Sequence, residues 1–369
     1  MTSFSDIITF TRSSAAWRYN EFGILEQVPA NQPRFDYDPV TLALRGLLVE
    51  EQRTNLALQS GNVAVSPWVS SGAPSVTGAY ALAPDGTMSA TRVVFTASGG
   101  FQARAQNVAG IIGTTYTASF WIRATTTPGQ TVRIWFDGTG GVSAPAVVTT
   151  TMEWTRYSVT GAAADTTLTL QISISNPTTD ADILVWGAQL EAGAFPTSYI
   201  PTTSSQVTRA ADVASVNTLS PWFNPDEGTL FVEAIPGSGL VASKGIVSLF
   251  SGPANRITLF RQAQADAPFR WYNSPGTPDR GGVVGGSAPD GAVVKGAAAF
   301  DSGGYRALSV NGSAVVQASV TGGPDFGAFE SLGIMRSYGT TNELMNGHIR
   351  RIRYWPRRLF DNELQRITA

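Results

Sequence analysis

Aromatic and arginine side chains that alternate with apolar residues are the part of this sequence best suited to bind a ligand. They lie in two β-type segments, 116–124 and 131–137, and are Trp121, Arg123, Arg133 and Trp135. Sugars present apolar C–H faces that stack on Trp and Tyr rings, while polar side chains bind their hydroxyls. Alternation places the four side chains on the wet face of a sandwich, opposite its core. We predict carbohydrate binding there; the alternative is a face covered by the protein itself or by another subunit.

A second aromatic set lies in the C-terminal part of the chain. It consists of Trp271, Tyr272, Tyr305 and Arg306, which can line a concave sheet face. Core packing is the alternative for each of them. The densest basic and aromatic run, Arg350–Arg358, can bind anionic glycan or nucleic acid. Because the formal net charge is −2 and no second basic stripe is present, we interpret this run as salt-bridged contacts and predict no nucleic-acid partner.

Catalytic chemistry finds little support in the residue pattern. A glycosidase needs two carboxylates about 5–9.5 Å apart across the sugar. The close acid pairs, interpreted as turn formers or arginine partners, are Asp36/Asp38, Glu50/Glu51, Asp180/Asp182 and Asp226/Glu227. A Ser-His-Asp triad would have to use His348, the only histidine, and no Gly-x-Ser-x-Gly sequence is present. We therefore predict no catalytic residues and no enzymatic activity.

Metal and cofactor sites are equally poorly supported. The sequence has no Cys and one His, which excludes cysteine-based zinc sites and leaves no histidine cluster. No phosphate-binding glycine loop ends in Gly-Lys-Ser/Thr. Structural calcium stays open as an alternative, because loop carboxylates are its ordinary ligands. The candidates are Asp137, Asp165, Asp180 and Asp182. We assign no cofactor and no metal ligand.

Composition favours an all-β protein. Only 14% of the 369 residues are charged, whereas Gly occurs 38 times and Pro 21 times. Such a composition suits short strands joined by tight turns and suits helices poorly. The length exceeds the usual size of a single domain. We therefore predict two β-sandwich domains, jelly-roll or lectin-like, in tandem behind a short irregular N-terminal segment.

The domain boundaries follow from the stretch Leu184–Asp212. Its first half has the pattern of a closing β-strand with a bend at Gly187, and its second half is rich in Pro, Thr and Ser, as linkers are. We predict one sandwich over 56–200, a linker over 201–225 and a second sandwich over 226–369. Alternating apolar residues mark strands in the first sandwich, notably over 168–174.

Local turn and cap signals mark the second sandwich. Asn311–Gly312 between 305–310 and 313–317 predicts a hairpin with a type I′ turn, because both residues accept positive φ angles. After the strand 348–355 a short helix is predicted, with Asp361 as its cap and Glu363 in its first turn.

Residues 1–55 are predicted to form a docking segment rather than a domain. The piece 33–56 has the pattern of two short strands with a turn at Asp38–Pro39, and such a pair is not stable alone. It must dock on the next domain, on a neighbouring subunit or on a larger assembly. The apolar residues expected to make anchoring or oligomer contacts are Phe35, Tyr37, Leu47 and Leu48.

Several stretches resemble known families. YTASFWIRA (116–124), MEWTRYSVTG (152–161) and LVWGAQLEAGAFPTSYIPT (184–202) are similar to strands of jelly-roll carbohydrate-binding modules. YRALSVNGSAV (305–315) and GHIRRIRYWPRRLFDNELQRI (347–367) resemble a laminin-G-like, concanavalin-type sandwich. These folds host binding, adhesion and purely structural roles.

The opening, FTRSSAAW followed by PRFDYDPVTLALRGLLVEEQRTNL within 10–56, resembles the start of bacteriophage tail-fibre and head-fibre proteins that carry these two domains. The resemblance implies a virion surface protein, a homotrimer, that attaches to surface polysaccharide and contacts other virion proteins through its N-terminal segment. The alternatives are a structural head or tail decoration protein without ligand and a glycan-degrading tailspike enzyme. No secretion signal and no apolar run of about 18 residues is present, so we expect synthesis in the host cytoplasm, no membrane insertion and a final location on the virion.

Overall fold

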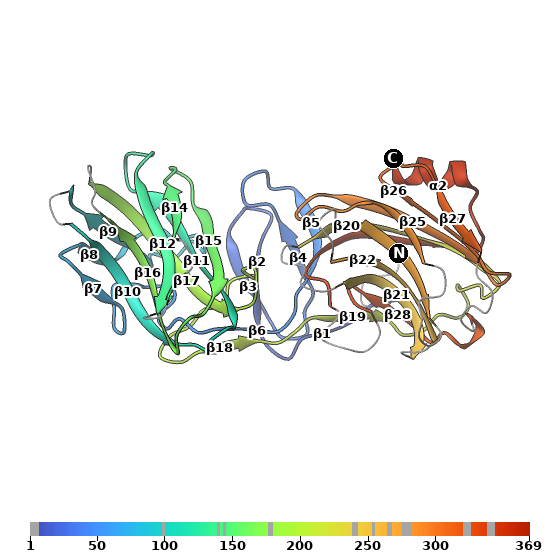
Figure 1. Ribbon diagram of the computed structural model, residues 1–369, viewed down its shortest axis with the longest axis horizontal. Helices are drawn as coiled ribbons and strands as arrows, with labels where there is room; N and C mark the ends of the chain where they lie inside the picture. Colours follow the sequence, from blue (N-terminus) through green and yellow to red (C-terminus); the bar gives the residue numbers. More distant parts are fainter. Residues whose placement is uncertain are drawn as a thin grey trace. The chain divides into compact units, whose positions relative to one another are not determined.

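The computed structural model describes residues 7–97, 100–138, 141–142, 145–175, 180–237, 243–252, 255–263, 268–274, 282–319, 326–337 and 344–369. Within these ranges the chain folds almost entirely into β-strands (Figure 1). The predicted all-β class and the tandem sandwiches are confirmed. None of the helices in the described part of the chain is long and apolar enough to cross a membrane.

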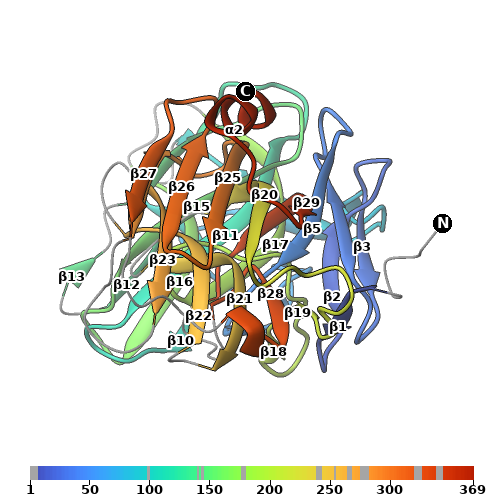
Figure 2. The same cartoon turned by 90° about the vertical axis from the view of Figure 1, so that its right-hand side faces the viewer.

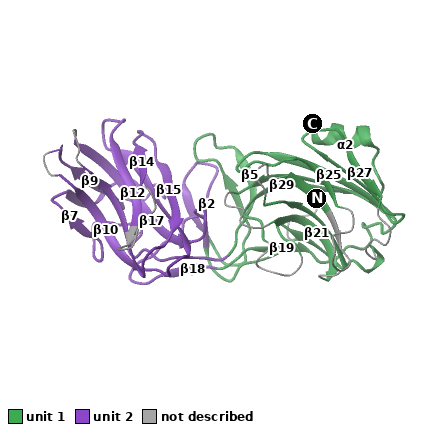
Figure 3. Ribbon diagram, in the orientation of Figure 1, with its two compact units in different colours: residues 1–15, 28–51, 210–369 green, residues 16–27, 52–209 purple. Residues whose placement is uncertain are grey.

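The chain divides into two compact units (Figure 3). The first sandwich comprises Ala16–Gln27 and Gln52–Arg209. The second sandwich comprises Met1–Ala15, Val28–Glu51 and Ala210–Ala369. The N-terminal segment is therefore shared between the two units instead of forming a third part.

The first sandwich is built from two main sheets. One has the order β15–β11–β17–β9–β8, with β15 (Thr155–Ala162), β11 (Thr115–Ala124), β17 (Ala181–Ala192), β9 (Ala90–Phe95) and β8 (Ser75–Ala81). The other has the order β13–β12–β16–β10–β7, with β14 also on β12; its strands are β13 (Gly141–Val142), β12 (Thr131–Gly138), β16 (Thr167–Ile174), β10 (Gln102–Ala109), β7 (Val69–Ser71) and β14 (Ala146–Thr149). Two small ribbons accompany them: β2 (Ala16–Tyr19) pairs with β3 (Leu25–Val28), and β6 (Arg53–Asn55) with β18 (Val207–Arg209).

The core of the first sandwich follows from the alternation in its strands. Val132, Ile134 and Phe136 of β12 are buried, as are Leu170 and Ile172 of β16, and all five belong to one apolar cluster. Residues between them point to the outer face of the sheet. The strand pattern predicted over 131–137 and 168–174 is therefore confirmed.

The second sandwich has two seven-stranded sheets. One runs β1–β19–β28–β21–β22–β23–β24, with β1 (Thr9–Thr11), β19 (Val213–Val216), β28 (Ser331–Ile334), β21 (Lys244–Gly252), β22 (Asn255–Arg261), β23 (Pro268–Ser274) and β24 (Val283–Ser287). The other runs β27–β26–β25–β20–β29–β5–β4, with β27 (Val316–Ser319), β26 (Tyr305–Val310), β25 (Val294–Asp301), β20 (Glu227–Pro236), β29 (Gly347–Trp355), β5 (Leu44–Val49) and β4 (Arg34–Tyr37).

The hairpin and helix of the second sandwich form where the sequence predicts them. Asn311 and Gly312 have φ angles of 49° and 72°, as a type I′ turn requires, and Ser313 N–H donates to the Val310 carbonyl. Helix α2 (Asp361–Thr368) packs against β25 and β26 through Leu364 (Figure 2). Its N-cap is Phe360, one residue before the predicted cap Asp361.

The division of residues 1–55 and 201–225 differs from the prediction. Strand β1 pairs with β19, and β5 pairs with β29, so the N-terminal segment completes both sheets of the second sandwich. The predicted linker supplies strands as well: β18 pairs with β6 in the first sandwich, and β19 lies between β1 and β28 in the second. Strands of three or four residues are too short to show a clear alternation, which is why both stretches have weak sequence signals.

Candidate functional site

The four residues predicted as one carbohydrate-binding set lie on two different sheets. Trp121 and Arg123 belong to β11, and Arg133 and Trp135 belong to β12. Each pair alternates with core residues of its own strand, so the two pairs point away from the core on opposite outer faces of the sandwich. The structure therefore does not bring the four side chains together.

Trp121 is a packing residue. Its ring is 2% exposed and lies edge-on to Trp186 and Tyr199, with centroid distances of 5.6 Å to each. The Trp121 indole N–H donates to the Tyr19 hydroxyl at 2.9 Å, and the Arg156 guanidinium lies 4.2 Å from the indole centroid. Burial raises the pKa of the Tyr199 hydroxyl. This outer face is thus covered, and its aromatic side chains are not available to a sugar.

The sequence analysis did not detect the cover over Trp121. It includes Tyr19 and Trp17 of β2, whose ring lies 5.5 Å from that of Tyr199. The available signal was the pattern AWRY, then Asn20–Gly23, then LEQV, which is that of a short hairpin with aromatic side chains.

Arg123 lies beyond this cluster at the end of the same sheet. Its guanidinium is 5.4 Å from the Trp154 centroid and donates to the Met152 carbonyl at 3.3 Å. The Trp154 indole N–H donates to the Leu82 carbonyl. Because Arg123 covers one face of the Trp154 ring, this pair offers little aromatic surface for stacking.

Arg133 and Trp135 lie on the outer face of the second sheet, which we call the β12 face. Both are half-buried, and the residues at the centre of this face, Ala103, Ala105, Gln171 and Ser173, are at most 7% exposed. Two rows of side chains cross it, because residues directly opposite on antiparallel strands share a face. One row is Val147, Arg133, Ser173, Ala103 and Ser71, and the next is Trp135, Gln171, Ala105 and Val69. Small and polar side chains therefore form the floor of this face, and Arg133 and Trp135 stand at one side of it.

The β12 face has the features that stacking requires. Trp135 is half-buried, and its indole N–H donates to the Ser173 hydroxyl at 3.1 Å, which fixes the ring over the floor. Arg133 is also half-buried, and no hydrogen bond or ion pair joins its guanidinium to another residue in the described ranges. Val147 and Val69 are 64% and 60% exposed, so apolar surface borders the face on both sides.

The predicted site residues of the second sandwich divide into core and surface. Trp271 is 1% exposed and belongs to the core, while the side chain of Tyr272 lies outside the described residues. Arg306 is fully buried with its guanidinium 5.1 Å from the Phe326 centroid, and burial lowers its pKa to about 10. Tyr305 packs against α2 and donates to Asp361, and burial raises its pKa to about 12. The structure gives packing contacts to Trp271, Tyr305 and Arg306.

The predicted anchoring residues also have contacts inside the second sandwich. Leu47 is 3% exposed in the core, and Phe35 packs against that core. Leu48 is buried and pairs with His348 of β29, and Tyr37 is half-buried at the end of β4. These residues therefore stabilise the sheet to which β4 and β5 belong, and a free anchoring role does not follow from them.

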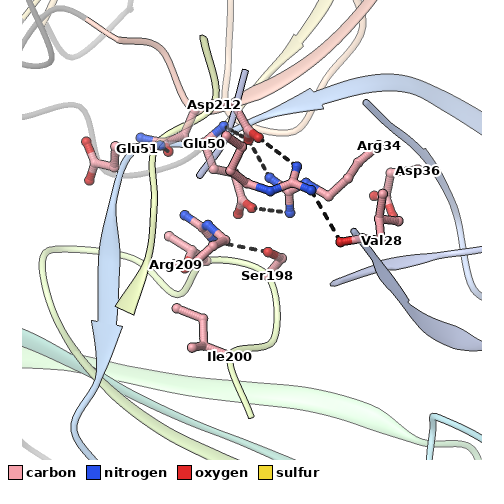
Figure 4. A network of polar contacts seen from close by, with 12 residues as sticks. Val28, Arg34, Asp36, Glu50, Glu51, Ser198, Ile200, Arg209 and Asp212 are labelled. Carbon is pink, nitrogen blue, oxygen red and sulfur yellow. Dashed lines mark hydrogen bonds and ion pairs between the residues drawn. The ribbon is translucent and has the colours of Figure 1, made fainter. Parts of the chain in front are cut away.

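The close carboxylates are engaged as the sequence analysis expected of turn formers and arginine partners. Arg34 pairs with Glu50 at 2.8 Å and with Asp212, both fully inside the second sandwich (Figure 4). Arg12 also pairs with Asp212, at 3.0 Å. Asp38 pairs with Arg45, and Asp36 lies 2.8 Å from His348 Nε2. Glu50, Asp38 and Asp36 thus each contact a basic side chain inside the second sandwich.

The calcium candidates are scattered. Asp182 accepts both of its hydrogen bonds from Arg92, Asp180 accepts from Ala97 N–H, and Asp165 accepts from Thr166 N–H. The side chain of Asp137 lies outside the described residues. Among the described residues, no three His, Asp or Glu side chains gather closely enough to hold a metal ion.

An apolar pocket of about 580 Å³ lies in the second sandwich, where no site was predicted. It is lined by Ile7, Pro221, Trp222, Phe223, Asn224, Tyr354 and Pro356. The Trp222 indole N–H donates to the Thr218 carbonyl, and the Tyr354 hydroxyl is bonded to the backbone of Asn224. Burial raises the Tyr354 pKa to about 12. Because these polar groups are already hydrogen-bonded within the protein, the pocket suits a sugar poorly. The sequence feature that could have indicated this pocket is the aromatic pair Trp222–Phe223 in the predicted linker.

Comparisons with known proteins concern the fold alone. No protein-family model and no curated protein matches the chain. Among solved structures, it is similar to the CBM40 of the Ruminococcus gnavus IT-sialidase, with 15% identity and a TM-score of 0.33 over 40% of this chain and 84% of that one. A pentraxin from Limulus polyphemus is 12% identical, with a TM-score of 0.33, and the match covers 39% of this chain and 70% of that one. The CBM22 tandem of Paenibacillus barcinonensis Xyn10C is 11% identical, with a TM-score of 0.28, and the match covers 84% of this chain and 97% of that one. At this level, the similarity says nothing about a ligand.

Proposed function

We propose that this protein attaches to surface polysaccharide without catalysing a reaction, and that the β12 face is its binding surface. The observation that carries the proposal is Trp135, held half-exposed over a floor of small side chains next to Arg133. A fixed aromatic ring gives a sugar an apolar surface at little entropic cost, and a neighbouring polar group orients it.

A single site of this kind binds weakly. Several copies on one particle compensate, because linked sites raise avidity about 10²–10⁴-fold without any new contact. The proposed setting is a bacteriophage fibre or decoration protein, a homotrimer on the virion. The resemblance of residues 10–56 to the start of such proteins supports this setting.

The virion contact in this proposal lies in the turn between β4 and β5. Val40 and Leu42 in this turn and Leu44 at the start of β5 are 79%, 47% and 48% exposed, whereas Phe35, Leu47 and Leu48 are half-buried or buried in the sheet. Phe22 and Ile24, which are also exposed, belong to the first sandwich. Three exposed apolar side chains within five residues are suited to contact another protein. This turn replaces the buried Leu47 and Leu48 as the part of the segment available to a partner.

Glycan binding by wild type and by Trp135→Ala tests the proposal. We expect the wild-type chain to bind members of a bacterial polysaccharide array, and the variant to lose about 10-fold in affinity, which corresponds to about 1.4 kcal/mol. Trp154→Ala on the opposite sheet is the matched control and should bind as wild type does. An array without signal above background, or a Trp135→Ala chain that binds normally, would contradict the proposal.

The same preparations distinguish the enzymatic alternative. The viscosity of a bound polysaccharide should stay constant during incubation with the protein. A fall in viscosity would show chain cleavage and favour a glycan-degrading tailspike.

A further inference from the structure

Arg133 carries a charge that the described part of the chain does not neutralise. Arg12, Arg92 and Arg261 each have a carboxylate within 3.0 Å, and Arg104, Arg123 and Arg306 donate to backbone carbonyls instead. Arg133 has no such partner among the described residues. The Arg133 guanidinium is therefore available to pair with an anion that a ligand supplies.

The cross-strand neighbours of Arg133 are Val147 and Ser173, neither of which is charged.

Arg133 and Trp135 are two residues apart on β12 and point to the same face. Their Cα atoms are therefore about 6.6 Å apart, which is on the scale of one sugar ring. A sugar stacked on Trp135 would place a ring substituent beside the Arg133 guanidinium. The planar guanidinium fork matches a carboxylate with two parallel hydrogen bonds.

We propose that the β12 face selects acidic sugars, with Arg133 pairing with a carboxylate of the sugar that stacks on Trp135. This inference rests on the proposed glycan attachment and adds the class of ligand. Binding of such a ligand weakens with salt, because the ion pair forms at a surface accessible to solvent.

The test uses purified full-length chain and a panel of uronic-acid and sialic-acid oligosaccharides, each paired with its methyl ester. The ester keeps the ring and removes the charge. We expect the wild-type chain to bind the acid at least about 10-fold more tightly than the ester. In Arg133→Gln this preference should disappear, so that acid and ester bind with equal affinity. Arg133→Lys keeps the positive charge but lacks the planar guanidinium. Its preference for the acid over the ester should therefore lie between those of wild type and Arg133→Gln.

Arg123→Gln is the matched control, because Arg123 is a half-buried arginine on the opposite sheet. It should keep the wild-type preference. Equal wild-type affinity for acid and ester would overturn the inference, and so would a preference that survives in Arg133→Gln. If wild type binds the acid and the ester equally and Trp135→Ala abolishes binding, glycan attachment at the β12 face is supported and the selection of acidic sugars is contradicted. If no member of the panel and no glycan on the array binds, both fail.

Discussion

Arg12 and Asp212 are 200 positions apart in the sequence, yet their side chains form a 3.0 Å ion pair with no exposed surface. Arg34 approaches the other oxygen of the same carboxylate, and the Glu50 N–H donates to that oxygen at 2.9 Å. One buried carboxylate therefore holds three segments of the second sandwich: the start of the chain, the β4–β5 pair and the start of β19, which lies within the predicted linker.

Asp212→Asn should strongly destabilise the second sandwich. The substitution keeps the shape of the side chain but leaves the buried guanidinium groups of Arg12 and Arg34 with insufficient counter-charge. Removing one partner from a buried ion pair costs about 3–5 kcal/mol. Denaturant unfolding of wild type and variant measures the loss. Arg357→Ala, which breaks the exposed pair with Glu363, is the control and should lower the unfolding free energy far less than Asp212→Asn does. A loss in Asp212→Asn no greater than in the control would contradict this account.

A chain that begins at Gln52 should fail to fold its second sandwich. The deletion removes β1, β4 and β5, and with them Phe10, Leu47 and Val49 from the apolar core. Limited proteolysis followed by mass spectrometry should show rapid cleavage within 210–369. A protease-resistant 210–369 fragment that unfolds cooperatively would show that the N-terminal strands are dispensable.

The sequence predicted well what depends on local pattern. Alternation identified β12 and β16, and the positive-φ preference of Asn311–Gly312 identified the β26–β27 turn. The carbohydrate site was harder to predict. Alternation indicates which side chains point away from the core, but not whether another segment of the chain covers them. Trp121 and Trp135 follow the same rule, but only Trp121 lies under the β2–β3 hairpin.

The pairing of strands that are far apart in the sequence was the second feature that the sequence pattern could not predict. Strands of three residues, such as β1 and β18, are too short to show the alternation of apolar and polar residues. Their partner strands lie about 150 to 200 residues away in the chain. The prolines of the opening segment indicated irregular structure, although the residues between them complete sheets. The acid pairs could be assigned to arginine partners, but which arginine meets which acid depends on the tertiary fold.

Asp182→Asn should flatten the acid dependence of stability in the first sandwich. Hydrogen bonds from the Arg92 guanidinium hold the pKa of Asp182 below its usual range. The folded state therefore binds this proton more weakly than the unfolded state. The resulting stability is complete above the ordinary Asp pKa of about 3.9 and is lost as pH falls towards the lowered value. Unfolding midpoints between about pH 7 and pH 3 should fall less steeply in the variant. Parallel curves for the two chains would show that this pair contributes nothing.

Gly187→Ala should disturb the aromatic cluster of the first sandwich. Strand β17 does not end at this glycine; it continues to Ala192 through an irregular pairing with β11, and Gly187 has a φ of +64°. A Cβ atom at Gly187 would lie 2.5 Å from Cε3 of Trp121, so both the backbone and the indole ring must shift. Strain of this kind costs about 1–3 kcal/mol.

Thermal unfolding and the near-ultraviolet circular dichroism of the tryptophans measure the effect of Gly187→Ala. Gly61→Ala is the matched control in the same unit, because its Cβ would meet Trp186 and Tyr199 at an ordinary 3.5 Å, without a positive φ. The control should change stability by no more than about 0.5 kcal/mol. Since the β12 face lies on the other sheet, glycan binding by folded Gly187→Ala should match that of wild type. Equal stability of the two glycine variants would mean that the bulge at Gly187 does not position Trp121.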